Sequence, residues 1–481
     1  MPEIVFQQSK QRFMEEHIAL WNRVGHDYTR WSKTGVAYHR RLQQVYRVII
    51  PEGQSVLEIG CGRGDLLAAL HPRRGVGVDF SSEMITLARQ AHPELTFIES
   101  DAVDFESTET FDFIVLSDLL NDVWDVQVLF ELLNRYCGPH TRLVMNVYSR
   151  LWEPAIEVAS WLGLAKPHLQ QNWLTVSDLA NLLELAGFEK IRSWREFLFP
   201  LRIPLLNGLF NRFLAKTWLF SWLDLANFVV ARKRGYPLPE SEAPLVSVII
   251  PTRNEAGNIA ELLARTPELG RGSEIIFVDG HSTDGTPEVI QREMAAHPER
   301  NCAFYTQTGK GKGDAVRLGY ARAHGEMLMI LDADISVPPE DLQRFYNALV
   351  SGVGDFINGV RLVYPMEKEA MRFFNLLGNK FFSNLFTWLL GQPVKDTLCG
   401  TKVLWKRDYD RIAANRSVFG DFDPFGDFDL LFGAARLNLK IVDLPIRYHE
   451  RTYGSTNISR WQNGWMLLRM SAFASGRLRF F

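Results

Sequence analysis

The chain contains few cysteines and no long apolar run, and these two absences restrict its class. Its 481 residues include four cysteines, all far apart in the sequence. Such scattered thiols form neither a disulfide framework nor a zinc-ligand spacing, which is typical of a cytosolic protein with reduced cysteines. No uninterrupted apolar stretch of about 18 residues occurs, so we expect no membrane-spanning helix. The first residues also lack the apolar core of a secretory signal peptide.

The sequence also lacks an excess of charge of one sign. A formal net charge of −3, from 53 basic and 56 acidic residues, provides no basic field over the chain, so nucleic acid is a poor default partner. Apolar residues make up 46% and charged residues 23%, as in globular proteins, and the length suggests two or three domains. The proline-rich stretch 235–244, GYPLPESEAP, is typical of a linker and predicts domains at 1–234 and 245–481.

Two carboxylates that follow an apolar run carry the main functional signal of the second half. The run Met329–Leu331 is expected to be a buried parallel strand, and it leads into Asp332-Ala333-Asp334. Because side chains alternate along a strand, Asp332 and Asp334 would leave on the same side. A divalent cation is commonly held by one or two carboxylates, with substrate phosphates and water completing its shell. On its own, Asp-X-Asp is more often a solvated strand end, so the neighbouring motifs decide.

Other predicted strand ends in this half are polar as well. A strand over 246–250 leads to Pro251–Glu255, and a strand over 274–278 ends at Asp279. Polar groups at the strand ends of an open α/β sheet are where ligands bind. The stretch Gly309–Asp314 contains three glycines and two lysines at the start of a helix expected to reach about Ala323. Such a helix start suits a phosphate.

In combination, these motifs resemble the family 2 (GT-A fold) glycosyltransferases over residues 245–460 or so. The closer resemblance is to polyprenyl- and dolichyl-phosphate sugar synthases, and it rests on Asn358–Arg361, Asp396–Lys402 and Leu444–Ile446. The resemblance implies that Asp332 and Asp334 hold Mg²⁺ or Mn²⁺ on the diphosphate of a nucleotide-sugar, and that both are catalytic. It also places five residues near the nucleotide: Pro251, Arg253, Glu255, Asp279 and Asp284.

The same resemblance leaves two kinds of acceptor open. A lipid monophosphate is already anionic and needs no general base, and Arg361, Arg372 and Lys402 would then bind its phosphate. A sugar hydroxyl requires a base, for which Asp427 is the best candidate. Ordinary surface cations and a turn with capping acids are the alternatives for these positions. In either case, direct displacement would invert the anomeric centre.

A glycine-rich turn follows the first predicted strand of the other half, at 55–59. Its spacing is Gly-X-Gly-X-Gly over 60–64, which differs from the Gly-X-Gly-X-X-Gly of the dinucleotide fingerprint. The second strand ends at Asp79, whose carboxylate can accept both hydroxyl protons of a ribose. The third strand leads to Asp101, which could border an adenine.

Four pieces in this order, LEIGCGRG, GVGVDFSSEMI, FIESDAVDF and FDFIVLSDLL, resemble a class I S-adenosylmethionine-dependent methyltransferase over roughly residues 40–234. The resemblance implies a Rossmann-like seven-stranded sheet whose last strands, at 190–197 and 227–232, form an antiparallel hairpin. The residues implied to contact the cofactor are Glu58, Gly60, Gly62, Gly64, Asp79 and Asp101. No residue here is assigned a catalytic role, since Asp122 and Asp125 suit a base but also suit helix capping. A Rossmann-like domain without a ligand is the alternative.

The stretch Arg372–Leu390 predicts a helix with one narrow polar stripe. A helix this apolar is either buried or lies in a membrane interface with Phe381, Phe382 and Phe386 on the lipid side. The basic and apolar segment 461–481 has the composition expected for anionic lipid surfaces. We therefore expect a peripheral enzyme at the cytoplasmic face of a membrane.

The sequence thus predicts a bifunctional enzyme with two α/β domains. One half would transfer a sugar from a nucleotide-sugar to a lipid-phosphate or glycan acceptor, and the other would transfer a methyl group. The alternative is a glycosyltransferase whose methyltransferase-like half is a non-catalytic scaffold or an S-adenosylmethionine-binding regulatory module. A sensor that turns over neither ligand is disfavoured by the intact acidic strand ends in both halves.

Overall fold

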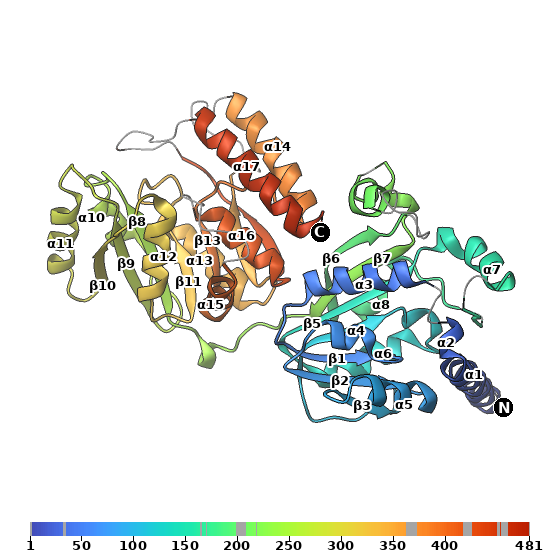
Figure 1. Ribbon diagram of the computed structural model, residues 1–481. Helices are drawn as coiled ribbons and strands as arrows, with labels where there is room; N and C mark the ends of the chain where they lie inside the picture. The colour runs from blue at the N-terminus through green and yellow to red at the C-terminus, as the bar shows by residue number, and fades with distance from the viewer. Residues whose placement is uncertain are drawn as a thin grey trace. The chain divides into compact units, whose positions relative to one another are not determined.

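The computed structural model describes residues 2–31, 35–163, 166–169, 171–198, 208–217, 219–361, 373–416, 426–449, 453 and 460–480. The chain divides into two compact units, one of residues 1–234 with 479–481 and one of residues 235–478 (Figure 1). The predicted linker residues pack partly on the second unit, where the amide of Leu238 donates to the carbonyl of Val350. Gly235 lies so close to Gly352 that a Cβ on it would be 2.2 Å from the Gly352 carbonyl oxygen.

The first unit is built on a seven-stranded sheet with the order β3-β2-β1-β4-β5-β7-β6. Strands β1 to β5 pair in parallel, and β7 is antiparallel to both of its neighbours. This confirms the predicted Rossmann-like sheet with an antiparallel final hairpin. The elements of the unit are α1 (Pro2–His26), α2 (Tyr28–Trp31), α3 (Val36–Ile49), β1 (Ser55–Ile59), α4 (Asp65–Ala69), β2 (Arg74–Asp79), α5 (Ser82–Ala91), β3 (Thr96–Glu99), β4 (Phe111–Ser117), η1 (Leu120–Asp122), α6 (Val126–Leu133), β5 (Cys137–Tyr148), α7 (Glu153–Trp161), α8 (Val176–Leu185), β6 (Phe188–Glu196) and β7 (Ala226–Lys233).

Alternating residues of the central strands enter two different cores, one on each face of the sheet. Leu57 packs in the core that contains residues of α6 and α8. Its neighbour Val56 packs in the core that contains residues of α3, α4 and α5. Because the side-chain period of a strand is two, a continuous apolar run such as Val56–Leu57 is buried on both faces.

The second unit has a sheet with the order β10-β9-β8-β11-β13-β12-β14. Strands β10, β9, β8 and β11 are parallel, whereas β13 is antiparallel to both β11 and β12. The carboxyl ends of the four parallel strands therefore meet at one edge. The elements are β8 (Val246–Thr252), α10 (Ile259–Arg265), β9 (Ser273–Asp279), α11 (Thr286–Ala296), β10 (Asn301–Thr306), α12 (Lys312–Arg322), β11 (Met327–Ile330), α13 (Leu342–Val350), β12 (Phe356–Val360), α14 (Phe373–Leu390), β13 (Lys402–Trp405), α15 (Lys406–Ala414), α16 (Asp427–Arg436), β14 (Ile441–Pro445) and α17 (Arg460–Leu478).

Helix α14 lies beside α17, as Figure 1 shows, and contributes to the core of this unit. Phe386 is 0% exposed and its ring lies 5.2 Å from the rings of Phe428 and Phe432 on α16. Phe382 is 8% exposed, whereas Phe381 is 55% exposed. The predicted lipid-facing role is therefore wrong for Phe382 and Phe386, because α16 and α17 cover them.

The two phenylalanines of α14 offer a matched test of this burial. We expect Phe386→Ala to lower the free energy of unfolding of the second unit by about 3–5 kcal/mol, through lost transfer energy and a cavity. Phe381→Ala, on the exposed side of the same helix, should change it by less than about 0.5 kcal/mol. Chemical denaturation followed by circular dichroism measures both. Equal effects of the two substitutions would contradict the placement of α14 in the core.

Candidate functional site

The predicted Asp-X-Asp motif lies in a turn beyond β11. Strand β11 ends at Ile330, so strand alternation does not orient Asp332 and Asp334 as the sequence suggested. The turn is fixed instead by Ser336, whose amide and hydroxyl donate to Asp334 Oδ1 at 3.0 and 2.6 Å. Between them Ile335 has a φ of 54°, a rare conformation for a β-branched residue. Both carboxylates remain partly exposed, on either side of the buried Ala333.

Lys312, the first residue of α12, forms an ion pair with Asp332. Burial alone would lower the pKa of Lys312, but the carboxylates of Asp332, Asp427 and Asp334 raise it above its ordinary value. All three acids therefore lie close to one ammonium group. Gly400 makes this close approach possible, since a Cβ there would lie 2.2 Å from both Asp332 Oδ2 and Lys312 Nζ.

Two further cations of the site are each held by a carboxylate. Arg361 donates to Asp396 in a bidentate pair, from Nε at 2.7 Å and from Nη2 at 2.9 Å. The side chain of Lys402 is 0% exposed and its Nζ lies 3.0 Å from Oδ1 of Asp427. A phosphate could contact Lys402 only if this pair opened. Asp427 could accept a proton from an acceptor hydroxyl only after the same opening. The predicted roles of Arg361, Lys402 and Asp427 stay predictions, and Arg372 lies outside the described residues.

The charges around Asp332 explain its protonation state. Burial alone would raise its pKa, but Lys312, Arg361 and Lys402 together lower it below the ordinary value. Asp332 is therefore an anion with cations on several sides. A carboxylate of this kind can share its charge with a metal ion.

A second group of polar residues lies at the ends of β9 and β10. Asp279 is 2% exposed and accepts from the amide of Ser282 at 3.1 Å through Oδ2. Among the described residues, Asp279 Oδ1 and the Oε1 of Gln307 have no hydrogen-bond partner although both are buried. Gln307 was missed in the sequence because it follows β10 without a recognisable motif. The sequence feature that could have identified Gln307 is its position one residue after the parallel strand β10.

The other residues predicted near the nucleotide shape the loops around Asp279. Glu255 is buried and accepts from Nδ2 of Asn258 at 2.8 Å, and its amide donates to Thr286 Oγ1. Asp284 is exposed and accepts from the amide of Ala256 at 3.2 Å. Pro251 lies in β8 and Arg253 is exposed directly after that strand. The structure thus brings the predicted set to one edge of the sheet, with Glu255 and Asp284 bonded into the loops.

In the first unit, the glycine loop joins β1 to α4. Gly62 and Gly64 have φ values of 51° and 77°. A Cβ on Gly64 would lie 2.5 Å from the ring of Phe97, whereas among the described residues no atom lies within 4 Å of a Cβ on Gly62. Gly64 is thus required by packing, and Gly62 borders open space where a ligand could approach the backbone.

The three predicted carboxylates lie in or beyond the neighbouring strands β1, β2 and β3. Asp79 accepts from the amide of Gly62 at 2.8 Å and from that of Ser81 at 2.9 Å. Asp101, beyond β3, accepts from the amide of Val103 at 3.2 Å. Glu58 is 3% exposed and accepts from the amide of Leu67 at 3.1 Å, which ties β1 to α4. Burial is the main cause that raises the pKa of all three.

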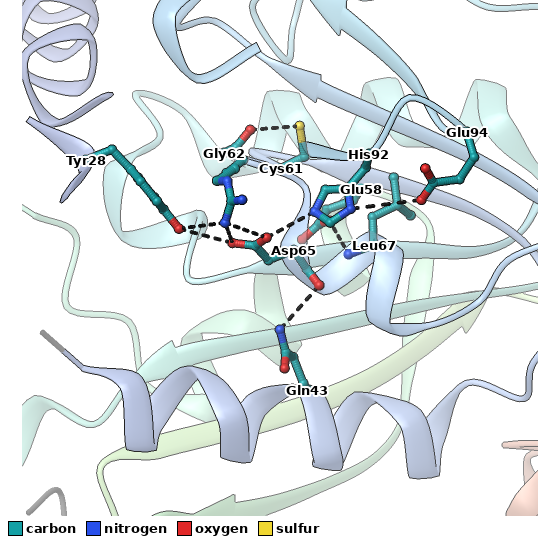
Figure 2. Close-up of polar contacts among 10 residues, drawn as sticks. Tyr28, Gln43, Glu58, Cys61, Gly62, Asp65, Leu67, His92 and Glu94 are labelled. Carbon is teal, nitrogen blue, oxygen red and sulfur yellow. Dashed lines mark hydrogen bonds and ion pairs between the residues drawn. The ribbon is translucent and has the colours of Figure 1, made fainter. Parts of the chain in front are cut away.

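A network that the sequence did not reveal anchors the loop from outside. Figure 2 shows Asp65 between Tyr28 of α2 and His92 at the end of α5. His92 Nε2 lies 3.0 Å from Asp65 Oδ1, and Arg63 donates to Asp65 Oδ1 at 3.1 Å. Gln43 of α3 donates to the Asp65 carbonyl at 3.3 Å. The N-terminal helices therefore lie against the glycine loop, which only tertiary contacts could show.

The two acids considered as bases after β4 differ in their surroundings. Asp125 accepts from the amide of Val128 at 3.1 Å and caps α6. Asp122 accepts from Nε2 of Gln171 at 3.0 Å instead. Burial is the first cause that raises its pKa, and Gln171, His17 and His168 oppose this.

Comparison with known families finds a match in each half of the chain. Residues 32–193 match the family model described as a methyltransferase domain, and residues 247–411 match that of glycosyl transferase family 2. The second half is similar to "Glycosyltransferase AglJ" of Haloferax volcanii, with 27% identity over 47% of this chain and 70% of that protein. It is also similar to "Undecaprenyl-phosphate 4-deoxy-4-formamido-L-arabinose transferase" of Pseudomonas aeruginosa, with 34% identity over 24% of this chain and 35% of that protein.

The first half is similar to a solved SAM-dependent methyltransferase from Thermotoga maritima. The match has 17% identity and a TM-score of 0.36 and covers 45% of this chain and 98% of that one. The chain spans about a third of the length of the Pseudomonas aeruginosa relative.

The buried pair of Lys402 and Asp427 makes a prediction about stability. Lys402→Met should lower the free energy of unfolding of the second unit by about 3–5 kcal/mol, because it leaves an unpaired buried carboxylate. Lys402→Met combined with Asp427→Asn should recover much of this loss, since the charge is then removed. Urea denaturation of the three proteins measures the coupling. Additive losses in the double variant would show that the pair is not coupled.

Proposed function

Because the chain carries a methyltransferase domain and a glycosyltransferase family 2 domain, we propose that it is a bifunctional enzyme with two separate transfer sites. The second unit transfers a sugar from a nucleotide-sugar to a lipid-phosphate or glycan acceptor. The observation that carries this proposal is the gathering of Asp332, Asp334 and Lys312 at the edge where β8, β9 and β11 end. Ligands bind in open α/β sheets at this edge.

The residues at this edge fit a Mg²⁺ or Mn²⁺ ion that is shared with the donor. Asp332 is anionic and already attracts one cation, the ammonium of Lys312. In the parts of the chain that the structure describes, no group of three or more His, Cys, Asp or Glu side chains could hold a metal by itself. Two carboxylates with substrate phosphates completing the shell are a common way to hold Mg²⁺. The ion would neutralise charge that develops on the leaving diphosphate.

The protein residues around the ion have their own roles in the proposed transfer. Asp332 and Asp334 would hold the ion, and Lys312 is the partly exposed cation that could turn from Asp332 towards a phosphate oxygen. The unpartnered Oδ1 of Asp279 and Oε1 of Gln307 suit hydrogen-bond donors of a nucleobase. Fixing the donor in this way lowers the entropy cost of bringing it to the acceptor.

The acceptor is proposed to be a polyprenyl-type phosphate or a glycan. The undecaprenyl-phosphate transferase among the relatives supports the lipid alternative. Such a phosphate needs no base, whereas a sugar hydroxyl would need Asp427 to leave its pair with Lys402. With a single displacement the anomeric centre inverts.

Association with a membrane surface is proposed through α17. Its outer face carries Trp465, Leu468 and Phe473, which are 72%, 40% and 36% exposed, together with the basic Arg469 and Arg477. Exposed aromatic and basic side chains on one helix suit an anionic lipid surface. No helix in the described ranges is long and apolar enough to cross a bilayer. A place at the cytoplasmic face of the membrane is part of the same proposal.

The first unit is proposed to bind S-adenosylmethionine and to transfer its methyl group. The open space at Gly62, with Asp79 bonded to the same loop, fits a ribose against the backbone. A carboxylate has about four lone-pair positions, so Asp79 can hold the loop and still accept from hydroxyl groups. The cofactor supplies an electrophilic methyl group. The alternative, a glycosyltransferase with a non-catalytic first unit, is separated by calorimetric titration of S-adenosylmethionine and by an assay for methyl transfer.

The metal proposal predicts that Asp332→Asn abolishes sugar transfer. The loss of one charge-stabilising contact commonly costs about 3–4 kcal/mol in the transition state, which is 10²–10³-fold in turnover. The assay measures release of GDP or UDP from a panel of sugar nucleotides with and without a chelator.

The matched control for this variant is Asp410→Asn, on the exposed surface of α15, which should keep full activity. Circular dichroism must show that both variants are folded. Normal turnover in chelator, or in Asp332→Asn, would remove the metal from the mechanism.

The cofactor proposal predicts that Asp79→Ala weakens S-adenosylmethionine binding. Each lost hydrogen bond to a charged group is worth about 1.5–3 kcal/mol. Release of nucleotide from sugar donors should not change, because the two units have separate cores. Isothermal titration calorimetry gives the affinity. An unaltered Kd would exclude the ribose role, and a parallel loss of sugar transfer would show that the units are not independent.

A further inference from the structure

A polar cluster lies beyond the carboxyl end of β4, next to the glycine loop, and the sequence placed only its acids Asp118 and Asp122 there. Asp118 is the first residue after this strand and has a φ of 54°. Its neighbour Leu119 packs against Gly60, where a Cβ would be 2.8 Å from a Leu119 methyl carbon. Asp118 is partly exposed, so its carboxylate can reach a ligand beside the loop.

The Asp118 carboxylate is held in place by two elements. Tyr38 of α3 donates to its Oδ1 at 2.7 Å, and Asn146 of β5 donates to the same oxygen. Asn146 is itself oriented, since its Oδ1 accepts from Tyr46 at 2.8 Å and from Ser117 at 3.0 Å. A side chain oriented from two sides in this way is pre-organised.

Around the nearby Asp122, several buried acceptor atoms of the described residues have no hydrogen-bond partner. His17 of α1 is 2% exposed, and its Nδ1 lies 2.8 Å from the carbonyl of Phe13, so in the neutral ring Nδ1 carries the proton and Nε2 is an acceptor. In the described part of the chain, Nε2 of His17, Nε2 of His168 and Oε1 of Gln171 are buried without a hydrogen-bond partner. His17 and His168 both influence the pKa of Asp122, and Asp122 influences that of Asp118, so the cluster is continuous.

The other side of the cluster provides donors. Tyr148 has a pKa raised well above the ordinary one, first by burial, and so keeps its hydroxyl proton, whereas Tyr38 already donates its proton to Asp118. Lys166 is a cation close enough to Asp118 to lower its pKa. An ammonium ligand could satisfy the acceptors but would meet Lys166 and could accept nothing from Tyr148. A hydroxyl both donates and accepts, so a polyhydroxylated ligand satisfies both sides.

We propose that this cluster is the methyl-acceptor site of the first unit, that it takes a sugar hydroxyl, and that Asp118 is the catalytic base. This inference rests on the proposed methyl transfer. In the step, the acceptor oxygen forms a bond to the methyl carbon while the bond from that carbon to sulfur breaks. The bonding pair stays on sulfur, and the hydroxyl proton passes to Asp118. His17, His168 and Gln171 are positioning residues that hold the other hydroxyl groups of the sugar.

The groups that face Asp118 give the reaction a pH dependence. These groups are Tyr38 from α3, Asn146 and Tyr148 from β5, Asp122 from η1 and Lys166. Burial is the main cause that raises the pKa of Asp118 to about 6, opposed by Tyr38, Asn146 and Lys166. A base must be deprotonated to act, so kcat should rise with pH up to about 6 and then level. This rise of kcat with pH should be absent from the Asp118→Asn variant.

The test uses the full chain with methyl-tritiated S-adenosylmethionine and a set of probes. The probes are the methyl glycosides of glucose, mannose and rhamnose, and the amine-bearing methyl glycoside of glucosamine. We expect tritium in an ether linkage of a neutral glycoside. Asp118→Asn should lower kcat at least 100-fold with an unchanged Kd for S-adenosylmethionine, and His17→Phe should raise KM more than it lowers kcat. The control Asp125→Asn, which keeps the cap of α6, should behave as the unmodified chain.

Calorimetric titration of the glycosides into the chain saturated with S-adenosylhomocysteine gives a reading that does not depend on turnover. Binding weakened at least 10-fold by His17→Phe supports the site. Labelling of no glycoside, labelling only at the amine, or full activity of Asp118→Asn would overturn the proposal. If S-adenosylmethionine still binds in any of these cases, the cofactor site stands and only the acceptor site fails.

Discussion

The edge at which parallel strands end determines where this chain can do chemistry. Within each sheet the backbone groups of a strand are bonded to its neighbours, and its side chains are enclosed by helices on both faces. Polar groups become available only where the chain leaves the sheet. Because β8, β9 and β11 are parallel, Asp279 and Asp332 leave at the same edge although they are far apart in sequence. The first unit repeats this arrangement with Asp79 after β2 and Asp118 after β4.

The second unit gathers several charges at its edge, and their pairing makes this possible. A buried charge is tolerated when it has a partner, and removal of one partner leaves the other uncompensated. Lys402 is paired with Asp427 and Arg361 with Asp396, while Lys312 pairs with Asp332 at the more exposed end. The two more enclosed pairs suit rigidity. The partly exposed pair is the one that a substrate can open without unfolding its surroundings.

Helix α14 shows how one sequence pattern can be compatible with two environments. Its apolar face fits a protein core and a lipid interface equally well, since both exclude water. Contacts with α16 and α17 bury Phe382 and Phe386, and the hydroxyl of Ser383 donates to the carbonyl of Val394 at 2.9 Å. The polar stripe of α14 therefore also bonds to protein. The proposed membrane contact is instead made by the exposed apolar residues of α17.

The sequence by itself determined the two α/β domains and their order. Apolar runs that end in a glycine or an acidic residue are local patterns, and they mark the strands and the loops that follow them. It also placed Asp79, Asp279 and Asp332 at strand ends. Only the tertiary structure decided that Lys402 faces Asp427 and that Gln307 lies beside Asp279. It also decided that Tyr38, Asn146 and His17 lie around the turn after β4. These residues come from segments tens of residues apart, and their meeting depends on strand order and helix packing. No local pattern encodes which side chains meet there, since such contacts arise only when the sheets assemble.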